Sequence, residues 1–133
     1  MARHHASRAR ALVGTRFRPL GRVPQFGIDC IGLAVIVFCV PAEQVPSAYR
    51  LRGDHEQRLR AALGRFFRDV PPTKARAGDL LLLKVADDQL HLAVATDSGF
   101  VHADAGRRRV VEVPQSPPWP LLAAYRARRI VRD

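Results

Sequence analysis

The sequence predicts an α+β fold in which N-terminal helices pack on an antiparallel β-meander. Helix-type spacing of apolar residues is confined to the first half of the chain. From Gly78 onward, short apolar runs alternate with turn residues, which is typical of a meander. The 133 residues, 47% of them hydrophobic, suffice for one core and leave little room for a second. We therefore expect a single domain that spans residues 1–133.

Two helices are expected in the first half. A short helix at Ser7–Val13 ends before Gly14, and the Arg-, Pro- and Gly-rich stretch that follows is expected to be a loop up to Gly27. The clearest helix begins at the N-cap residue Asp54 and ends before Pro71-Pro72. Its apolar residues recur at helical spacing, namely Leu59, Leu63, Phe66 and Phe67.

The second half predicts four strands, at Leu80–Val85, Leu90–Thr96, Phe100–Ala103 and Val110–Val113. Turn residues at Asp87-Asp88 and Asp97-Ser98-Gly99 separate the first three strands. Pro114–Pro120 contains four prolines and is expected to be a loop. The final apolar segment, Ala123–Val131, is expected to be either a last edge strand or a short helix.

The chain is strongly basic. Its 22 basic and 12 acidic side chains give a formal charge of +10, and 20 of the basic residues are arginine. Such a charge favours polyanions, and three explanations are open: nucleic acid, an anionic envelope polymer, or an arginine bias that only affects solubility. No zinc-ligand spacing, helix-turn-helix pattern or aromatic stacking motif accompanies the charge, so nucleic-acid binding is not expected to be the main function.

The first ten residues are basic, but no hydrophobic stretch with a small-residue cleavage site follows them, so no signal peptide is expected. The longest apolar run, Cys30–Val40, has 11 residues and is about half as long as a membrane-spanning helix. It is expected to be a core segment, and no membrane span is expected. With two cysteines and no sign of export, we expect reduced thiols and a protein that is cytoplasmic on synthesis.

Cys30 is the first candidate for chemistry. If it opens a helix, unpaired backbone N–H groups and the helix dipole favour its thiolate, the form that attacks a carbonyl carbon. The alternative is a buried structural cysteine in a Val- and Ile-rich strand. Cys39 lies at the other end of the segment, before Pro41, and is expected to be a core residue. In either secondary structure the two thiols are too far apart to form a disulfide.

Two histidines are expected on adjacent strands, with an acidic residue beside them. Strand alternation sets His91 among small side chains on one face of its strand, and His102 and Asp104 together on the next strand. A hairpin that turns at Asp97-Ser98 sets His91 opposite Asp104 and diagonal to His102. Either residue could orient the imidazole of His91.

These residues are open to three interpretations. A cysteine at a helix start, a histidine that deprotonates it and a polar residue that holds this histidine activate a nucleophile for acyl transfer. Each histidine could instead be a core residue with satisfied hydrogen bonds. A zinc site of His91, His102 and Asp104 is the third interpretation, although Cys30 would be an unusual fourth ligand.

Five short blocks occur in a characteristic order along about residues 6–113. They are Gly14-Thr-Arg-Phe-Arg18 with Gly21, Gly27-Ile-Asp-Cys-Ile-Gly-Leu33, Gly78-Asp79-Leu80, His91-Leu-Ala-Val94 and Phe100-Val-His-Ala103. The ordered set resembles the NlpC-type cysteine peptidases, papain-like enzymes that cut cell-wall peptides. The resemblance implies a papain-like version of the expected fold.

The resemblance also implies a role for each residue of the site. Cys30 is the implied nucleophile, His91 the general base and acid, and His102 the third, orienting member. The backbone N–H of Cys30 is implied to contribute to an oxyanion hole. Asp29 is similar to the family residue that meets the free amine of a stem peptide. No metal or organic cofactor is implied.

Three departures from the family pattern concern the substrate. Phe17 stands where the family usually has Tyr, so a hydroxyl near the nucleophile is missing. Ile31 replaces the usual Ser after the nucleophile, and Pro19-Leu20-Gly21 replaces the usual Trp-Gly-Gly. We count Phe17 and Ile31, together with Asp29, as candidates for substrate binding.

The Pro-Pro-Trp-Pro segment and the basic tail are most similar to the leaderless version encoded with phage tails and gene transfer agents. The resemblance implies an enzyme that hydrolyses an amide bond in peptidoglycan stem peptides through a Cys30 thioester. It would act at the cell wall as a tail-tip component, with tail or baseplate proteins as partners. Two alternatives are open: a catalytically inactive component that docks through its arginine-rich surface, and a thiol acyltransferase of the same fold.

Overall fold

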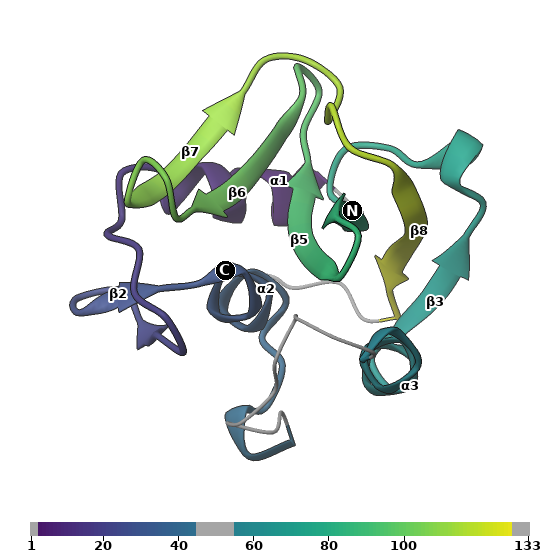
Figure 1. Ribbon diagram of the computed structural model, residues 1–133, viewed down its shortest axis with the longest axis horizontal. Coiled ribbons are helices and arrows are strands. Elements are labelled where there is room, and N and C mark those ends of the chain that lie inside the picture. Colours follow the sequence, from purple (N-terminus) through teal and green to yellow (C-terminus); the bar gives the residue numbers. More distant parts are fainter. Residues whose placement is uncertain (1–2, 45–54, 129–133) are drawn as a thin grey trace.

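The structure, a computed structural model, describes residues 3–44 and 55–128. In these residues the chain forms three α-helices, a two-stranded sheet and a six-stranded antiparallel sheet with the strand order β3-β8-β4-β5-β6-β7. The larger sheet runs from β7 at the left to β3 at the right of Figure 1. The helices are α1 (Arg3–Ala11), α2 (Cys30–Phe38) and α3 (Glu56–Gly64). This arrangement confirms the predicted α+β class.

The four strands predicted in the second half are confirmed, with ends shifted by at most one residue. They are β4 (Leu80–Ala86), β5 (Gln89–Ala95), β6 (Phe100–Asp104) and β7 (Arg109–Val113). The segment after β7 is a loop, as its prolines predict. Alternation and turn residues were sufficient to predict these strands, because β4, β5, β6 and β7 pair in the order in which they occur along the chain.

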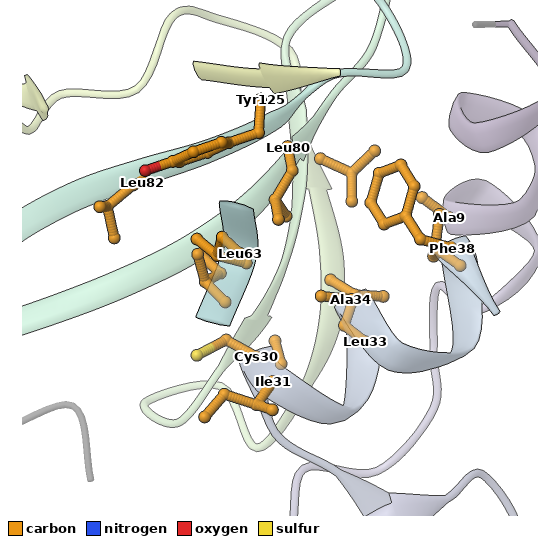
Figure 2. Packing of buried hydrophobic residues seen from close by; sticks show 14 of the residues in the cluster. Ala9, Cys30, Ile31, Leu33, Ala34, Phe38, Leu63, Leu80, Leu82 and Tyr125 are labelled. Atoms are coloured by element: carbon orange, nitrogen blue, oxygen red, sulfur yellow. The ribbon is translucent and has the colours of Figure 1, made fainter. Parts of the chain in front are cut away.

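One face of the sheet forms the main core with the helices. Leu80 and Leu82 of β4 are fully buried and belong to the same cluster as Leu33 and Phe38 of α2. Figure 2 shows these side chains with Tyr125 of the last strand, between the sheet and α2. Burying a leucine side chain stabilises a fold by about 1.5–3 kcal/mol, so this layer holds α2 firmly on the sheet.

The two ends of α2 are defined by their caps. The side chain of Asp29 caps the N-terminus, and Cys39 ends the helix in the left-handed conformation with φ 53°. Arg8 of α1 donates hydrogen bonds to two backbone carbonyls in the last turn of α2, at 2.8 and 2.9 Å. The prediction that Cys39 is a core residue is wrong, because the left-handed turn leads the chain out of the core and leaves Cys39 exposed.

The N-terminal segment contains more regular structure than the sequence predicts. α1 begins at Arg3 rather than Ser7, and the predicted loop contains β1 (Arg22–Val23) and β2 (Gly27–Ile28), which pair antiparallel. The N–H of Phe17 donates to the carbonyl of Arg108, so the chain before β1 runs along the edge of β7. A single sequence does not reveal this contact, because its two sides are about ninety residues apart.

The helix predicted up to Pro71 ends earlier, at Gly64. Phe67 begins β3 (Phe67–Val70) and pairs with Ala127 of the last strand, with its side chain 2% exposed. Phe66 and Phe67 are therefore not helical, since burial in the sheet outweighs their helical spacing. The predicted N-cap Asp54 lies outside the described residues.

The last apolar segment is a strand, β8 (Leu121–Ala127), which is one of the two expected alternatives. It does not lie at the sheet edge, because it pairs with β3 on one side and with β4 on the other. The edge of the sheet is instead β3, the strand that follows α3, and β8 lies between β3 and β4. The last residues of the predicted segment, 129–131, lie outside the described residues.

Candidate active site

The start of α2 places Cys30 in a tight set of backbone contacts. The N–H of Gly32 donates to Oδ1 of Asp29 at 2.8 Å, which caps the helix one residue before Cys30. A Cβ on Gly32 would lie 2.2 Å from the carbonyl oxygen of Gly21, so the preceding loop needs a glycine here to pass the helix. The Cys30 segment was expected to be either the start of a helix or a buried strand, and the structure shows the start of a helix.

Asp29 also binds the loop before the helix. Its Oδ2 accepts a hydrogen bond from the N–H of Leu20 at 2.8 Å, and its Oδ1 accepts one from Nη1 of Arg22 at 2.8 Å. The pairing of β1 with β2 sets Arg22 opposite Ile28 and so brings the guanidinium to Asp29. This ion pair has no sequence signal, because an arginine seven residues before a capping aspartate is not a specific pattern.

The thiol of Cys30 is part of the buried cluster, and the residue is 5% exposed (Figure 2). Burial and then the charge of Asp29 raise the pKa of this thiol to about 12, whereas a backbone hydrogen bond from Leu92 and the charge of Arg22 lower it. The sequence predicts that the helix dipole favours the thiolate. In the folded chain, desolvation outweighs the dipole, and the thiol is neutral at pH 7.

β5 and β6 bring His91 and His102 together. The pairing of Val94 with Val101 agrees with the predicted hairpin register, which sets the two histidines on a diagonal. Nε2 of His91 lies 2.8 Å from Nδ1 of His102, and the rings meet edge to face. One of these two nitrogens carries the shared hydrogen, so the bond holds the ring of His91 and leaves its Nδ1 for another partner.

Asp104 is the other partner that strand geometry allows for His91. Its Oδ1 accepts hydrogen bonds from the N–H groups of Gly106 and Arg107 at 2.9 and 3.3 Å, so its main contacts are in the turn after β6. Its charge raises the pKa of both histidines, but burial has the larger effect. Burial and the neighbouring His102 lower the pKa of His91 to about 4, and burial lowers that of His102.

A pocket of about 400 Å³ contains most of the predicted site residues. Those that line it are Phe17, Asp29, Cys30, His91, His102 and Asp104. Ile31 is not among them: it is 6% exposed and lines a separate apolar pocket with residues of α3. The structure thus brings the three candidate catalytic residues to one cavity and directs Ile31 into the core.

Trp119 is a part of the pocket wall that is not among the predicted site residues. Its ring centroid lies 5.9 Å from that of His91 and 5.7 Å from that of His102. The proline-rich loop carries it onto the face of the sheet opposite the main core, where it packs against Phe100. The available signal was the single tryptophan of the chain between prolines. Its apolar ring shields the histidine pair from water and so contributes to their burial.

Two further features of the described residues concern the expected alternatives. In residues 3–44 and 55–128, no group of three or more His, Cys, Asp or Glu side chains is placed to hold a metal ion. The zinc interpretation therefore lacks a ligand cluster in this part of the chain. Among the helices that the structure describes, none is both long and apolar enough to cross a membrane.

No family model and no curated protein matches the sequence, whereas solved structures match the fold. NlpC1 from Trichomonas vaginalis has a TM-score of 0.68 and 15% identity over 95% of this chain, which spans 44% of that protein. The NlpC/p60 domain of the peptidoglycan hydrolase SagA has a TM-score of 0.61 and 20% identity over 86% of this chain and 89% of that domain.

The peptidoglycan hydrolase RipB from Mycobacterium tuberculosis has a TM-score of 0.59 and 19% identity over 94% of this chain. This chain spans 63% of the RipB chain, so it is shorter than two of these three structures. At such low identity the likeness concerns the fold alone. The chain has the papain-like α+β fold of NlpC/P60 domains.

Proposed function

We propose that residues 1–133 form a single cysteine peptidase domain that hydrolyses an amide bond in peptidoglycan stem peptides through a thioester at Cys30. The observation that carries this proposal is the common pocket of Cys30, His91 and His102. In this pocket Nε2 of His91 lies 2.8 Å from Nδ1 of His102. The likeness in fold to SagA and RipB, both described as peptidoglycan hydrolases, supports the substrate class.

The proposed reaction has two steps. Sγ of Cys30 attacks the carbonyl carbon of the scissile amide, and the thiol proton passes to Nδ1 of His91. His91 gives this proton to the leaving amine, the C–N bond breaks, and a thioester remains. His91 then takes a proton from a water molecule, which attacks the thioester carbonyl carbon. The C–S bond breaks, the carboxylic acid leaves, and His91 returns the proton to Sγ of Cys30. The backbone N–H of Cys30 stabilises the oxyanion in both steps.

The protonation states in the free protein favour one version of the first step. The pKa of Cys30 is raised and that of His91 is lowered, so both groups are neutral at pH 7. A preformed thiolate–imidazolium pair would instead require a lowered pKa for Cys30 and a raised pKa for His91. Proton transfer to His91 therefore accompanies the attack on the substrate, and His102 keeps the ring of His91 in position.

Two residues of the pocket wall are proposed to contact the substrate beside the scissile bond. Asp29 precedes the nucleophile, and the ring of Phe17 supplies an apolar surface without a hydroxyl. Ile31 also belongs to the predicted substrate-binding set. Because its side chain is buried, we propose that Ile31 acts on the substrate through its packing beneath the start of α2.

The direct test is to incubate the protein with purified muropeptides and to identify the products by mass spectrometry. We expect new amino and carboxyl ends with the unchanged protein and none with Cys30→Ala. Cys39→Ala is the matched control, because it removes the exposed thiol and should retain activity. The proposed peptidase activity is contradicted if the unchanged protein and Cys39→Ala both leave the muropeptides intact.

Burial of Cys30 favours one alternative function. A thiol that is 5% exposed, with a pKa raised to about 12, fits a component that keeps the fold and docks without catalysis. The muropeptide experiment separates the two functions. Intact muropeptides together with salt-sensitive binding to purified cell wall would favour docking.

At a finer level, we propose that this domain is a component of a phage-like tail or of a gene-transfer-agent tail. The proline-rich segment Pro114–Pro120 and the high arginine content support this assignment. The test is mass spectrometry of purified tail particles from cells that produce them. Recovery of the chain with tail or baseplate proteins is expected, and its absence from intact particles would contradict the assignment.

A further inference from the structure

The carboxylate of Asp29 lines the candidate pocket, but it already has three hydrogen-bond donors. These are the N–H groups of Gly32 and Leu20 and Nη1 of Arg22, each at 2.8 Å. The side chains of Asp29 and Arg22 are 15% and 21% exposed. Salt and water screen an ion pair weakly in such a sheltered place, so the two charges affect each other and the pocket strongly.

Arg22 is held in this pair by the fold. Its Nη1 also donates to the carbonyl of Gly21 at 2.8 Å, and its Nη2 is buried without a hydrogen-bond partner in the described part of the chain. The β1–β2 pairing keeps the backbone of Arg22 beside that of Ile28, directly before Asp29. The guanidinium therefore stays close to the carboxylate and offsets its charge at the pocket wall.

We propose that Arg22 determines the specificity of this site: by neutralising Asp29, it makes the pocket favour substrates that are uncharged where they face Asp29 over substrates with an ammonium group there. An unpaired carboxylate would attract an ammonium group, whereas a carboxylate bound to a guanidinium presents a neutral surface. The resemblance implies that Asp29 meets a free amine, and Arg22 changes that expectation.

The class of substrate rests on the proposed function, whereas the effect of Arg22 on the charge of the pocket does not. If the site cleaves stem peptides, the preferred peptide is acylated at its amino end, as it is while still attached to a glycan strand. A peptide already released from the glycan has a free ammonium group and is the poorer substrate.

Modification of Cys30 by small thiol reagents measures the charge preference of the pocket without catalysis. In a Cys39→Ser background, we compare the rates of a cationic aminoethyl and a neutral methyl methanethiosulfonate. The same thiolate attacks both reagents, forms a disulfide and expels methanesulfinate, so the ratio of the two rates cancels any change in the pKa of the thiol. Removing one sheltered charge should change this ratio by about three- to tenfold.

The variants are expected to act in opposite directions. Arg22→Gln leaves Asp29 unpaired and should raise the ratio of cationic to neutral rate, and Asp29→Asn leaves Arg22 unpaired and should lower it. The double variant and Arg22→Lys should remain close to the unchanged protein. Arg18→Gln is the matched control, because it removes an exposed arginine of the same loop. If Arg22→Gln does not fold, the opposite shift with Asp29→Asn still tests the pair.

Peptide hydrolysis is the second measurement, with one stem peptide in N-acetylated and free forms. The unchanged protein should favour the acetylated form in kcat/KM, and Arg22→Gln should move this preference toward the free form. Equal reagent ratios in all variants would overturn the role of Arg22, even if peptides are cleaved. Shifted reagent ratios without any cleavage would support Arg22 as the charge-setting residue and reject the proposed function.

Discussion

Cys30 begins a helix and is nevertheless a neutral thiol, because the helix start is itself buried. The dipole at a helix N-terminus typically contributes 0.3–1 kcal/mol to an anion, which is less than the cost of moving a thiolate out of water into an apolar core. Asp29 adds a negative charge next to the thiol, and Arg22 partly offsets it. The reactivity of Cys30 therefore depends on how the pocket lowers that cost when substrate is present.

Alkylation of Cys30 in the free protein should depend steeply on pH. With the pKa raised to about 12, the thiolate fraction grows about tenfold for each pH unit between 7 and 9, and the rate should follow it. The measurement is the rate of iodoacetamide modification in a Cys39→Ser background, by peptide mass spectrometry. A plateau below pH 8 would instead indicate a thiolate already stabilised by imidazolium.

Substitutions at the two neighbours of His91 should differ in effect. His102→Ala removes the hydrogen bond at 2.8 Å and should lower turnover roughly 100-fold or more, since the imidazole is then free to rotate. His102→Asn can still form a hydrogen bond and should retain part of the rate. Asp104→Ala should be mild, because its carboxylate mainly contacts the turn after β6.

The measurement for these variants is the rate on one muropeptide, with folding checked by a thermal melt. A near-normal rate for His102→Ala, with a severe loss for Asp104→Ala, would assign the orienting role to Asp104.

At the scale of the elements, a buried ion pair joins the start of β4 to β8. Asp79 is fully buried, and its two carboxylate oxygens accept hydrogen bonds from Nε and Nη2 of Arg126 at 2.9 and 2.8 Å. The N–H of Arg76 donates to the same carboxylate at 2.9 Å. This contact ties β8 to the start of β4, the strand that pairs with β5 and its site residue His91.

Asp79→Ala should reduce the free energy of unfolding by about 3 kcal/mol, because it leaves the Arg126 guanidinium without its partner. Glu43→Ala, an exposed carboxylate on the short helix η1 (Ala42–Gln44), is the control and should change stability by less than about 0.5 kcal/mol. Urea denaturation at one pH measures both. An equally small decrease in the free energy of unfolding for both variants would show that the Asp79–Arg126 pair is not important for stability.

At the scale of the whole molecule, the sequence has a formal net charge of +10. Three consecutive arginines are exposed: Arg107 and Arg108 lie in the turn after β6, and Arg109 begins β7. Ala105 and Gly106 of the same turn line the candidate pocket. Exposed Arg16 forms a β-bridge with Arg109 and adds to this group. An anionic polymer that binds this group of arginines would therefore lie close to the pocket.

Raising salt should lower activity on whole sacculi much more than on small soluble muropeptides. Exposed charges are screened within about 8–10 Å near physiological ionic strength, so docking weakens while the pocket chemistry is little changed. The measurement is product release from both substrates across a salt series. Parallel losses would argue against docking, and tight salt-sensitive DNA binding without wall activity would favour the nucleic-acid interpretation.

The sequence by itself determined the features that depend on neighbouring residues. The alternation in β4 to β7 and the turns between them are set by local propensity, and the short hairpin loop sets the diagonal of His91 and His102. Helical spacing followed by strand alternation was sufficient to predict the α+β class, and the resemblance carried by the ordered motifs named the three residues that share a pocket.

Only the tertiary structure decided the features that depend on distant segments. The inner position of β8, the start of β3 at Phe67, the exposure of Cys39, the place of Trp119 and the Arg22–Asp29 pair all result from such contacts. The state of Cys30 belongs to this group as well. Local sequence sets a helix dipole, but desolvation comes from every element packed around the thiol, and here desolvation is the larger effect.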